Sequence, residues 1–495
     1  MHLTPSDPSI LARRAGIVAA LRRIMPDGVV ADDAGLAAFD GDALTAYRQV
    51  PLVCVLPRTK EQVSSVLAFA ADENVPIVPR GAGTSLSGGA LPRGDAILLS
   101  LTRMNRIVEI DYENRCVVCE PGVTNLSITK AVEARGFYYA PDPSSQIACT
   151  VGGNVAENSG GIHCLKYGLT TNNLLGAEIV LAGGARVRLG GKSSGGGGGL
   201  DLLGVIAGSE GLLGVVVEAT LRILPKPPVT RTLLAAFRDV PAAGQCVAAV
   251  IASGIVPAAM EFMDRRCIQA VEDYCAPGYP RDAEGVLIVE LDGIAADVRD
   301  AVSRVIAIAK GAGAHDVREA SDEAERARLW AGRKAAFPAM GRLAPDMLCM
   351  DGTIPRRALP QVLARMAEMS KDYGLGFCNV FHAGDGNLHP LIIFDVMKPG
   401  EHERAEAFGA DILRLCVSVG GVLTGEHGVG VEKRDLMPAM FSDADLAQQQ
   451  RLKCAFDGAG LFNPGKVFPT LSACVEGGHM HVKDGRVPYP NIPRF

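Results

Sequence analysis

Two tracts of small, hydrogen-bonding residues constrain the fold of this chain more than any other feature. The first, residues 79–89, follows a predicted strand, and Arg80 and Leu86 are its only large side chains. The second, residues 141–145 and 150–161, begins about 60 residues later and contains no bulky side chain. Backbone N–H groups in such tracts can approach phosphate oxygens closely. The pair predicts a long dinucleotide running between the tracts, and the alternative is two tight turns at strand ends.

Neither glycine-rich stretch of the first half is a standard nucleotide fingerprint. Leu86 stands where a Rossmann motif requires its third glycine, and no helix is predicted to follow. The five glycines at 195–199 lack the Lys-Ser or Lys-Thr ending of a P-loop. Consecutive glycines hold no single backbone shape, so we predict a mobile surface loop there.

Hydrophobic periodicity predicts short strands alternating with helices. The predicted strands are 52–56, 75–78, 96–100, 107–111, 116–120, 177–181, 185–189, 286–291 and 378–382. The predicted helices are 61–73, 126–134, 242–253, 295–311, 360–373 and 443–456. The clearest predicted domain boundary is the proline-rich stretch Pro225-Lys226-Pro227-Pro228. We therefore expect an N-terminal helical segment (1–46), a dinucleotide domain (47–226), a cap domain (227–430), a C-terminal helical segment (431–470) and a tail (471–495).

Histidines gather in two motifs of the second half, residues 382–389 and 425–428. Asp385-Gly386 between two apolar runs is a strong hairpin signal, which would place His382 and His389 where strands meet a loop. Two imidazoles and one carboxylate make a three-ligand site with open positions on a divalent metal. Glu426 and His427 are adjacent and point in different directions, so one can bind metal while the other acts as a base. The alternative is that these are hydrogen-bonded loop histidines.

Composition excludes several classes of protein. The net charge is −6, without a basic block, which argues against nucleic-acid binding. The first residues show no secretory signal, and the uncharged stretch at 240–260 contains too many Pro, Gly and Ser residues for a membrane span. The 13 cysteines are scattered in apolar runs, as in reduced cytoplasmic proteins. Cys116 and Cys119 fall on opposite faces of a predicted strand, so no metal or redox role is expected for them.

The glycine-rich tracts, the segment 208–214 and Asn463-Pro464-Gly465-Lys466 resemble the FAD-binding fold of the vanillyl-alcohol-oxidase type. Further motifs at 330–334, 350–355, 382–389 and 425–428 resemble those of the FAD-linked 2-hydroxyacid dehydrogenases, and the resemblance covers nearly the whole chain. It implies an α+β protein in which a vanillyl-alcohol-oxidase-type FAD domain precedes an α/β cap. A C-terminal helical segment would then return to the flavin.

The resemblance also implies roles for individual residues. His382, His389 and Glu426 would bind a divalent metal (Zn, Mn or Fe), His427 would be the base, and Arg333 would grip the substrate carboxylate. The first tract contains no histidine that could attach to flavin, which implies non-covalent FAD. The implied FAD-binding residues are Arg80, Gly81, Ala82, Gly83, Thr84, Ser85, Gly88, Pro141, Ser144, Gly152, Gly153, Asn154, Asn158, Gly160, Glu210, Gly214 and Asn463.

The expected reaction is oxidation of a small 2-hydroxy acid, either glycolate or D-lactate, which differ by one methyl group. Relatives that act on larger dicarboxylates carry a Lys where this chain has Cys349-Met350-Asp351, which favours a monocarboxylate. The resemblance implies a second FAD-binding subunit and an iron–sulfur subunit that passes electrons toward quinone. The chain would be cytoplasmic and would meet a membrane only through these partners. Two alternatives are a flavin-free metal-dependent hydrolase and a non-catalytic FAD-binding subunit.

Overall fold

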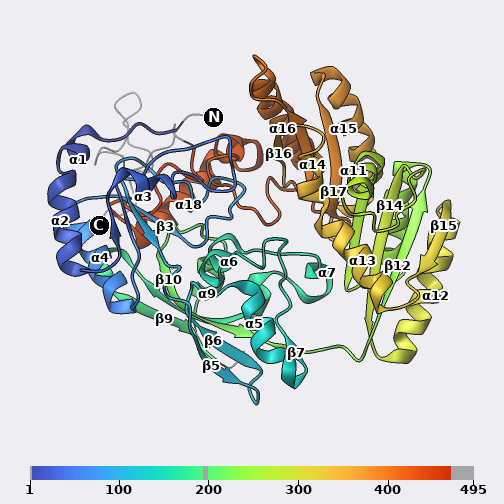
Figure 1. Ribbon diagram of the computed structural model, residues 1–495, viewed down its shortest axis with the longest axis horizontal. Helices are drawn as coiled ribbons and strands as arrows, with labels where there is room; N and C mark the ends of the chain where they lie inside the picture. Colours follow the sequence, from blue (N-terminus) through green and yellow to red (C-terminus); the bar gives the residue numbers. More distant parts are fainter. Residues whose placement is uncertain (1–2, 193–198, 470–495) are drawn as a thin grey trace.

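The chain forms two bodies, and it passes from the first to the second near residue 226 and returns to the first after α16. The computed structural model describes residues 3–192 and 199–469. In Figure 1 the first body, at the left, holds the N-terminal half and the red C-terminal helices. The second body, at the right, is built around one large sheet. Most of the five-glycine run and the whole tail 471–495 lie outside the described residues.

The N-terminal sheet carries the first glycine-rich tract at one strand end. Its order is β1-β2-β4-β3, with β2, β4 and β3 parallel. The four strands are β1 Val29–Val30, β2 Val53–Val55, β3 Ile77–Arg80 and β4 Ile97–Ser100. The helices are α1 Pro8–Ala12, α2 Arg14–Ile24, α3 Asp33–Ala37 and α4 Lys60–Asp72. The N-terminal segment is therefore not wholly helical, because β1 pairs with β2.

A five-stranded antiparallel sheet of order β5-β6-β10-β8-β9 completes the framework of the first body. Its strands are β5 Ile107–Asp111, β6 Cys116–Cys119, β8 Leu174–Val180, β9 Arg186–Gly190 and β10 Val215–Arg222. A short ribbon pairs β7 Phe137–Tyr138 with β11 Leu224–Pro225. The associated helices are α5 Asn125–Val132, η1 Glu133–Arg135, α6 Val151–Glu157, α7 Cys164–Tyr167, α8 Thr170–Asn173, η2 Ala182–Gly184 and α9 Leu202–Ile206.

Helix α6 lies within the second glycine-rich tract, where the sequence analysis predicts no helix. Gly152 and Gly153 suggested a turn, but they lie in the first turn of a helix that buries Val151 and Val155. A Cβ atom at Gly152 would lie 2.7 Å from the Cβ of Pro121, so glycine serves close packing there. The helix ends at Asn158, whose φ of 54° is left-handed.

The second body contains a seven-stranded sheet of order β15-β12-β14-β13-β17-β18-β16. Its strands are β12 Val229–Phe237, β13 Ala259–Asp264, β14 Gly285–Gly293, β15 Ala314–Glu319, β16 Asp346–Cys349, β17 Gly376–His382 and β18 Pro390–Phe394. Its helices are α10 Val240–Ala252, α11 Arg265–Cys275, α12 Ala295–Gly311, α13 Glu323–Lys334, α14 Ala336–Met340, η3 Arg356–Ala358, α15 Leu359–Tyr373 and α16 Glu401–Ser418. Apolar side chains from both faces of this sheet form buried cores. In the described residues, no helix is long and apolar enough to cross a membrane.

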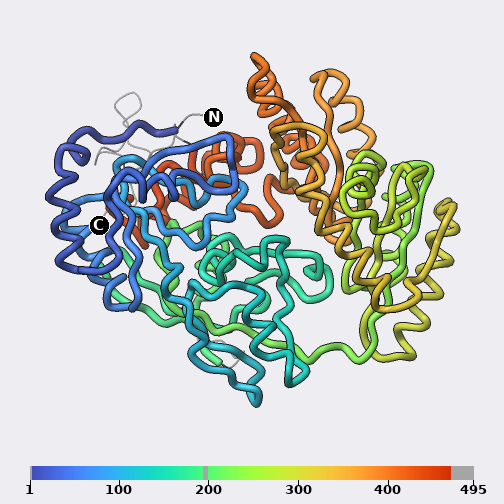
Figure 2. Tube along the Cα trace, viewed as in Figure 1, coloured from blue at the N-terminus to red at the C-terminus, as the bar shows by residue number. Residues whose placement is uncertain are grey.

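The C-terminal segment returns to the first body. It contains η4 Arg434–Leu436, α17 Met437–Met440 and α18 Asp443–Phe456. Figure 2 shows this red segment beside the blue N-terminal sheet. The return is fixed by backbone pairing, since the amide of Ile77 donates to Leu461 and the amide of Asn463 donates to Ile77. The C-terminal residues thus meet the strand that leads into the first tract.

Candidate functional site

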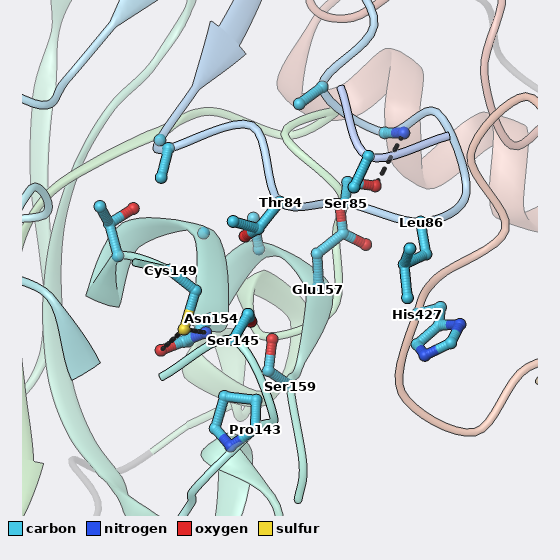
Figure 3. A pocket seen from close by; sticks show the side chains of 18 of the residues that line it. Thr84, Ser85, Leu86, Pro143, Ser145, Cys149, Asn154, Glu157, Ser159 and His427 are labelled. Carbon is cyan, nitrogen blue, oxygen red and sulfur yellow. Dashed lines mark hydrogen bonds between the residues drawn. The ribbon is translucent and has the colours of Figure 1, made fainter. Parts of the chain in front are cut away.

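A cavity of about 450 Å³ lies where the two bodies meet. Its walls come from the first tract, from residues 143–159 and from residues 209–216. The other body contributes residues 333–338, and the histidine motifs add His389, Glu426 and His427. Figure 3 shows Thr84 and Ser85 above helix α6, with Pro143 and Ser145 below and His427 at one side. Segments far apart in the sequence therefore share one cavity.

The first tract is an open loop held by its own hydroxyl and amide groups. Ser85 Oγ accepts a hydrogen bond of 3.1 Å from the amide of Gly89. Gly83 has φ of +75°, and an added Cβ would collide with the guanidinium of Arg80. Arg80 itself donates to the carbonyl of Gly41 at 2.6 Å. The loop therefore keeps an open shape, and its glycines and the side chains of Thr84, Ser85 and Leu86 line the cavity.

Most of the predicted cofactor residues line the cavity, but a minority stand behind it. The lining residues are Arg80, Gly81, Ala82, Gly83, Thr84, Ser85, Ser144, Gly152, Gly153, Asn154, Glu210 and Gly214. The residues outside the lining are Gly88, Pro141, Asn158, Gly160 and Asn463. Asn463 Nδ2 donates to the carbonyls of Gly89 and Glu210, which ties two loops together.

Two buried carboxylates, Glu157 and Glu210, lie close together in the wall of the cavity. Glu210 accepts hydrogen bonds of 2.7 Å from the amides of Val429 and Gly430. Glu157, on α6, lines the cavity, and its buried Oε2 atom has no hydrogen-bond partner in the part of the chain that the structure describes. Burial and the neighbouring Glu210 carboxylate raise the pKa of Glu157 well above its usual value. Sequence reasoning assigned Glu157 no role, although it is an isolated acid in a run of small residues.

The hairpin predicted from Asp385-Gly386 is confirmed. Strands β17 and β18 pair antiparallel, and His382 lies at the end of β17 while His389 directly precedes β18. The two imidazole centroids are 5.0 Å apart. Glu426 Oε1 lies 3.2 Å from His382 Nε2 and 3.5 Å from His389 Nε2. The three predicted metal ligands therefore converge, with one ligand atom from each within 4.8 Å of the others.

Asp351 is a site residue that sequence reasoning left without a role. It is fully buried, and its Oδ2 accepts hydrogen bonds from the amides of Gly425 and His427 at 3.0 and 2.8 Å. Its Oδ1 lies 3.4 Å from His389 Nε2. Asp351, His389 and His427 form a second potential ligand group that shares His389 with the first. The only sequence signal was one acid directly after an apolar strand.

Glu426 and His427 are adjacent in the sequence, but their surroundings shift their pKa values so that they differ in charge at neutral pH. Burial alone would raise the pKa of Glu426, but the hydrogen bond and charge of His382 outweigh it and lower this pKa to about 2. Burial lowers the pKa of His427 to about 4, although Asp351 opposes this shift. At neutral pH Glu426 is an anion and His427 is a neutral imidazole. His427 also stacks on His389, with ring centroids 4.9 Å apart, and its Nδ1 has no hydrogen-bond partner within residues 3–192 and 199–469.

Arg333 projects from the last turn of α13 and is only 5% exposed. Its Nε donates to Glu261 Oε2 at 2.8 Å, and Nη2 lies 2.7 Å from the same oxygen. Within the described residues, Nη1 makes no hydrogen bond, and Arg333 lines the cavity. The charge of Arg333, the expected clamp for the substrate carboxylate, is thus partly neutralised by Glu261, an acid within an apolar strand that sequence reasoning did not single out.

The residues of the cavity suit the groups that the sequence predicts. The glycine-rich backbone of both tracts lines the cavity, and the buried hydroxyl of Thr150 beside it has no hydrogen-bond partner among the described residues. His389 Nε2 is buried without a hydrogen bond beside two carboxylates, as expected for a nitrogen that binds a metal. Mixed imidazole and carboxylate ligation fits a divalent first-row ion.

Comparison with protein families identifies both halves of the chain. Residues 51–190 match the family described as "FAD binding domain", and residues 226–467 match "FAD linked oxidases, C-terminal domain". The glycolate oxidase subunit GlcD of Escherichia coli K12 is 52% identical over 483 residues, covering 97% of both chains. GlcD of Bacillus subtilis is 39% identical, covering 90% of this chain and 94% of that relative. A D-lactate dehydrogenase of Archaeoglobus fulgidus is 34% identical, covering 85% and 92%.

Solved structures agree on the fold. Substrate-bound p-cresol methylhydroxylase has a TM-score of 0.78 at 19% identity, covering 92% of this chain and 97% of that one. The 4-ethylphenol oxidase of Gulosibacter chungangensis has a TM-score of 0.75 at 19% identity, covering 93% and 98%. The expected architecture, an FAD domain followed by a cap, is confirmed. The match to an FAD-binding family also contradicts the alternative of a flavin-free hydrolase.

Proposed function

Because the chain belongs to the FAD-linked oxidase family, we propose that it oxidises glycolate to glyoxylate with non-covalent FAD. One observation carries the proposal. Arg333, whose Nη1 makes no hydrogen bond among the described residues, lines the same cavity as the neutral imidazole of His427 and two of the three potential metal ligands, His389 and Glu426. The extensive identity to two glycolate oxidase subunits supports this substrate.

In this proposal each part of the chain has one task. Residues 47–226 bind FAD between the first tract and α6, residues 227–430 bind the substrate, and residues 431–470 complete the cofactor site through Asn463. The lining residues of both tracts would contact FAD, while Gly88, Pro141, Asn158, Gly160 and Asn463 would shape the loops. When bound, FAD supplies the acceptor for the hydride that leaves C2 of the substrate.

The chain's own residues hold the substrate and move its proton. Arg333 Nη1 donates to the carboxylate, which fixes the acid at the end of the cavity and orients C2. His427 accepts the hydroxyl proton, since its lowered pKa keeps the imidazole neutral at pH 7. The substrate thereby loses one proton to His427 and one hydride from C2, which leaves the 2-oxo acid.

His382, His389 and Glu426 would hold a divalent metal, either Zn, Mn or Fe. Such an ion would supply positive charge near the hydroxyl oxygen as that oxygen loses its proton. Asp351 would support this site by holding the backbone of residues 425–427 in place.

D-Lactate is the second candidate substrate, because relatives named D-lactate dehydrogenase are 34% and 30% identical to this chain. A missing methyl group changes binding by about 1–3 kcal/mol, so one pocket can accept both acids. Lys334 lines the cavity next to Arg333 in the sequence, but it is exposed, whereas Arg333 is buried. We therefore still favour a monocarboxylate over a dicarboxylate.

We further propose that the chain works with a second FAD-binding subunit and an iron–sulfur subunit, because the relatives are themselves named as subunits. Electrons would pass through these partners toward membrane quinone, with this chain on the cytoplasmic side.

The test is a panel of 2-hydroxy acids with the purified, FAD-loaded chain and an artificial electron-accepting dye. Glycolate should give the highest kcat/KM, followed by D-lactate, and a dicarboxylate such as D-malate should be poor. His382→Ala and His389→Ala should each lower metal content and activity while FAD occupancy stays near that of the wild type. Full activity after exhaustive chelation would exclude the metal, and no activity with any acid would favour a non-catalytic FAD-binding subunit.

A further inference from the structure

Glu261 is a buried acid at the centre of the seven-stranded sheet. It lies in β13, and its side chain is fully buried. Strand β13 pairs with β17 in a register that sets Glu261 opposite His382. The neighbouring residues Met260 and Phe262 belong to the apolar core, so this position carries a charge where the strand pattern calls for none.

The two carboxylate oxygens of Glu261 serve two different residues. Oε2 receives Arg333, with Nε at 2.8 Å and Nη2 at 2.7 Å. Oε1 lies 2.8 Å from His382 Nδ1. One side chain therefore contacts the proposed substrate clamp with one oxygen and a proposed metal ligand with the other.

The contact to Arg333 decides which part of its guanidinium faces the cavity. Nε and Nη2 form one edge of the planar group, and that edge is turned to Glu261. Nη1 is then the nitrogen left for an incoming carboxylate. A flexible arginine without this partner could turn either edge toward the cavity.

The contact to His382 decides which ring nitrogen faces the proposed metal. Nδ1 is occupied by Glu261, so Nε2 is presented to Glu426, whose Oε1 lies 3.2 Å away. A carboxylate on the far nitrogen of a metal-binding histidine orients the ring and raises its strength as a ligand.

We propose that Glu261 is a positioning residue that sets the substrate clamp Arg333 and the metal ligand His382 together. The inference rests on the proposed function and deepens it, because it makes carboxylate binding and metal binding depend on one buried side chain. Arg333 and His382 come from different elements, α13 and β17, and Glu261 contacts both of them.

The experiment measures two affinities on the FAD-loaded chain without turnover. Zn²⁺ affinity is measured by competition with a chromophoric chelator. Acetate affinity is measured from the change in flavin absorbance, since acetate has the carboxylate but no hydroxyl to oxidise. His382→Ala should weaken only Zn²⁺ binding, and Arg333→Lys should weaken mainly acetate binding.

Glu261→Gln should weaken both. Loss of an outer carboxylate of this kind typically lowers metal affinity 10–100-fold, and we expect a drop in that range together with at least a tenfold loss of acetate affinity. Glu261→Asp keeps the charge but is one methylene shorter, so it should retain the fold and lose at least one of the two affinities. If Glu261→Gln does not fold, the two affinities of Glu261→Asp test the proposal instead.

Glu290→Gln is the matched control. Glu290 is a buried acid on the adjacent strand β14, and it holds the same helix α13 through Arg326 and Trp330 but does not contact His382. This variant should leave Zn²⁺ affinity unchanged. Equal losses of Zn²⁺ affinity in Glu290→Gln and Glu261→Gln would show a general disturbance of the sheet and overturn the proposal.

The affinities of the Glu261 variants test the positioning role, whereas glycolate oxidation by the wild-type chain tests the proposed function. If folded Glu261→Gln and Glu261→Asp both keep the two affinities within twofold of the wild type, Glu261 does not position either group. A wild-type chain that binds Zn²⁺ and acetate but does not oxidise glycolate would refute the substrate and leave the role of Glu261 intact. A wild-type chain that binds no Zn²⁺ would overturn the metal half of both proposals.

Discussion

Replacing Arg333 with alanine should weaken substrate oxidation and also destabilise the protein. The guanidinium has two partners in our proposal, the substrate carboxylate at Nη1 and Glu261 at Nε and Nη2. Both partners are carboxylates in a buried setting, because Arg333 is 5% exposed and Glu261 is 0% exposed. Alanine removes the positive charge from both contacts at once.

The magnitudes follow from burial. Removing one partner of a buried, hydrogen-bonded charge pair costs roughly 2–5 kcal/mol in binding. At about 1.4 kcal/mol per factor of ten, the loss in kcat/KM should be at least about 30-fold. Glu261 would be left with His382 as its remaining partner, so unfolding should become easier by roughly 3 kcal/mol, the lower end of the range for a broken buried pair. Arg333→Lys keeps the charge, so it should recover stability more fully than kcat/KM.

The assay combines steady-state kinetics with urea unfolding. Glycolate and D-lactate are oxidised with a dye as acceptor, so that no partner subunit is required, and KM is separated from kcat. KM should rise in Arg333→Ala, because the carboxylate is charged from the moment of binding, and kcat should fall as well through misorientation. If a folded Arg333→Ala or Arg333→Lys protein keeps the wild-type kcat/KM for both acids, the clamp lies elsewhere and our assignment of Arg333 is wrong.

Three further predictions concern the base, the cofactor and the joint between the two bodies. His427→Asn should lower kcat about 10²–10⁴-fold with little change in KM. Because the pKa of His427 is lowered to about 4, the kcat/KM of the wild type should stay constant down to about pH 5. A loss of kcat/KM near the ordinary histidine pKa of about 6.5 would contradict this assignment. Acid precipitation should release free FAD, since residues 79–89 contain no histidine, and flavin that stays with the denatured chain would refute non-covalent binding. His163 lies 2.9 Å from Asp142 and 3.3 Å from Glu290; burial alone would lower its pKa, but these carboxylates raise it to about 10. The stabilisation that protonated His163 provides should be complete below about pH 6.5 and disappear as the pH rises through 10. The difference in free energy of unfolding between wild type and His163→Gln, measured in urea, should therefore shrink over that range. A difference that does not depend on pH would refute this role of His163.

Local pattern alone predicted many elements of this fold. The helices at 295–311 and 443–456 have the bounds of α12 and α18, and the antiparallel hairpin around Asp385-Gly386 joins β17 to β18. These features depend on residues only a few positions apart, through helical periodicity, capping and turn chemistry. The first glycine-rich tract follows a strand, β3, as the sequence predicts.

The same local reasoning missed α6, because glycine was counted as a turn residue. Gly152 is needed instead for close contact with Pro121, a residue about 30 positions away. Whether a glycine makes a turn or admits a neighbour depends on what packs against it, and the sequence alone does not contain that information.

The amino-acid sequence is enough to name the chemical groups of the site, but how these groups act depends on the folded chain. His382, His389, Glu426 and His427 could be named from their motifs, but their convergence required β17, β18 and the 424–428 loop to meet. The neutrality of His427 comes from burial, and the orientation of Arg333 comes from Glu261, which is 72 positions away in the chain. Charge states and hydrogen-bond partners are set by desolvation and by long-range contacts, and both arise only when the chain is folded.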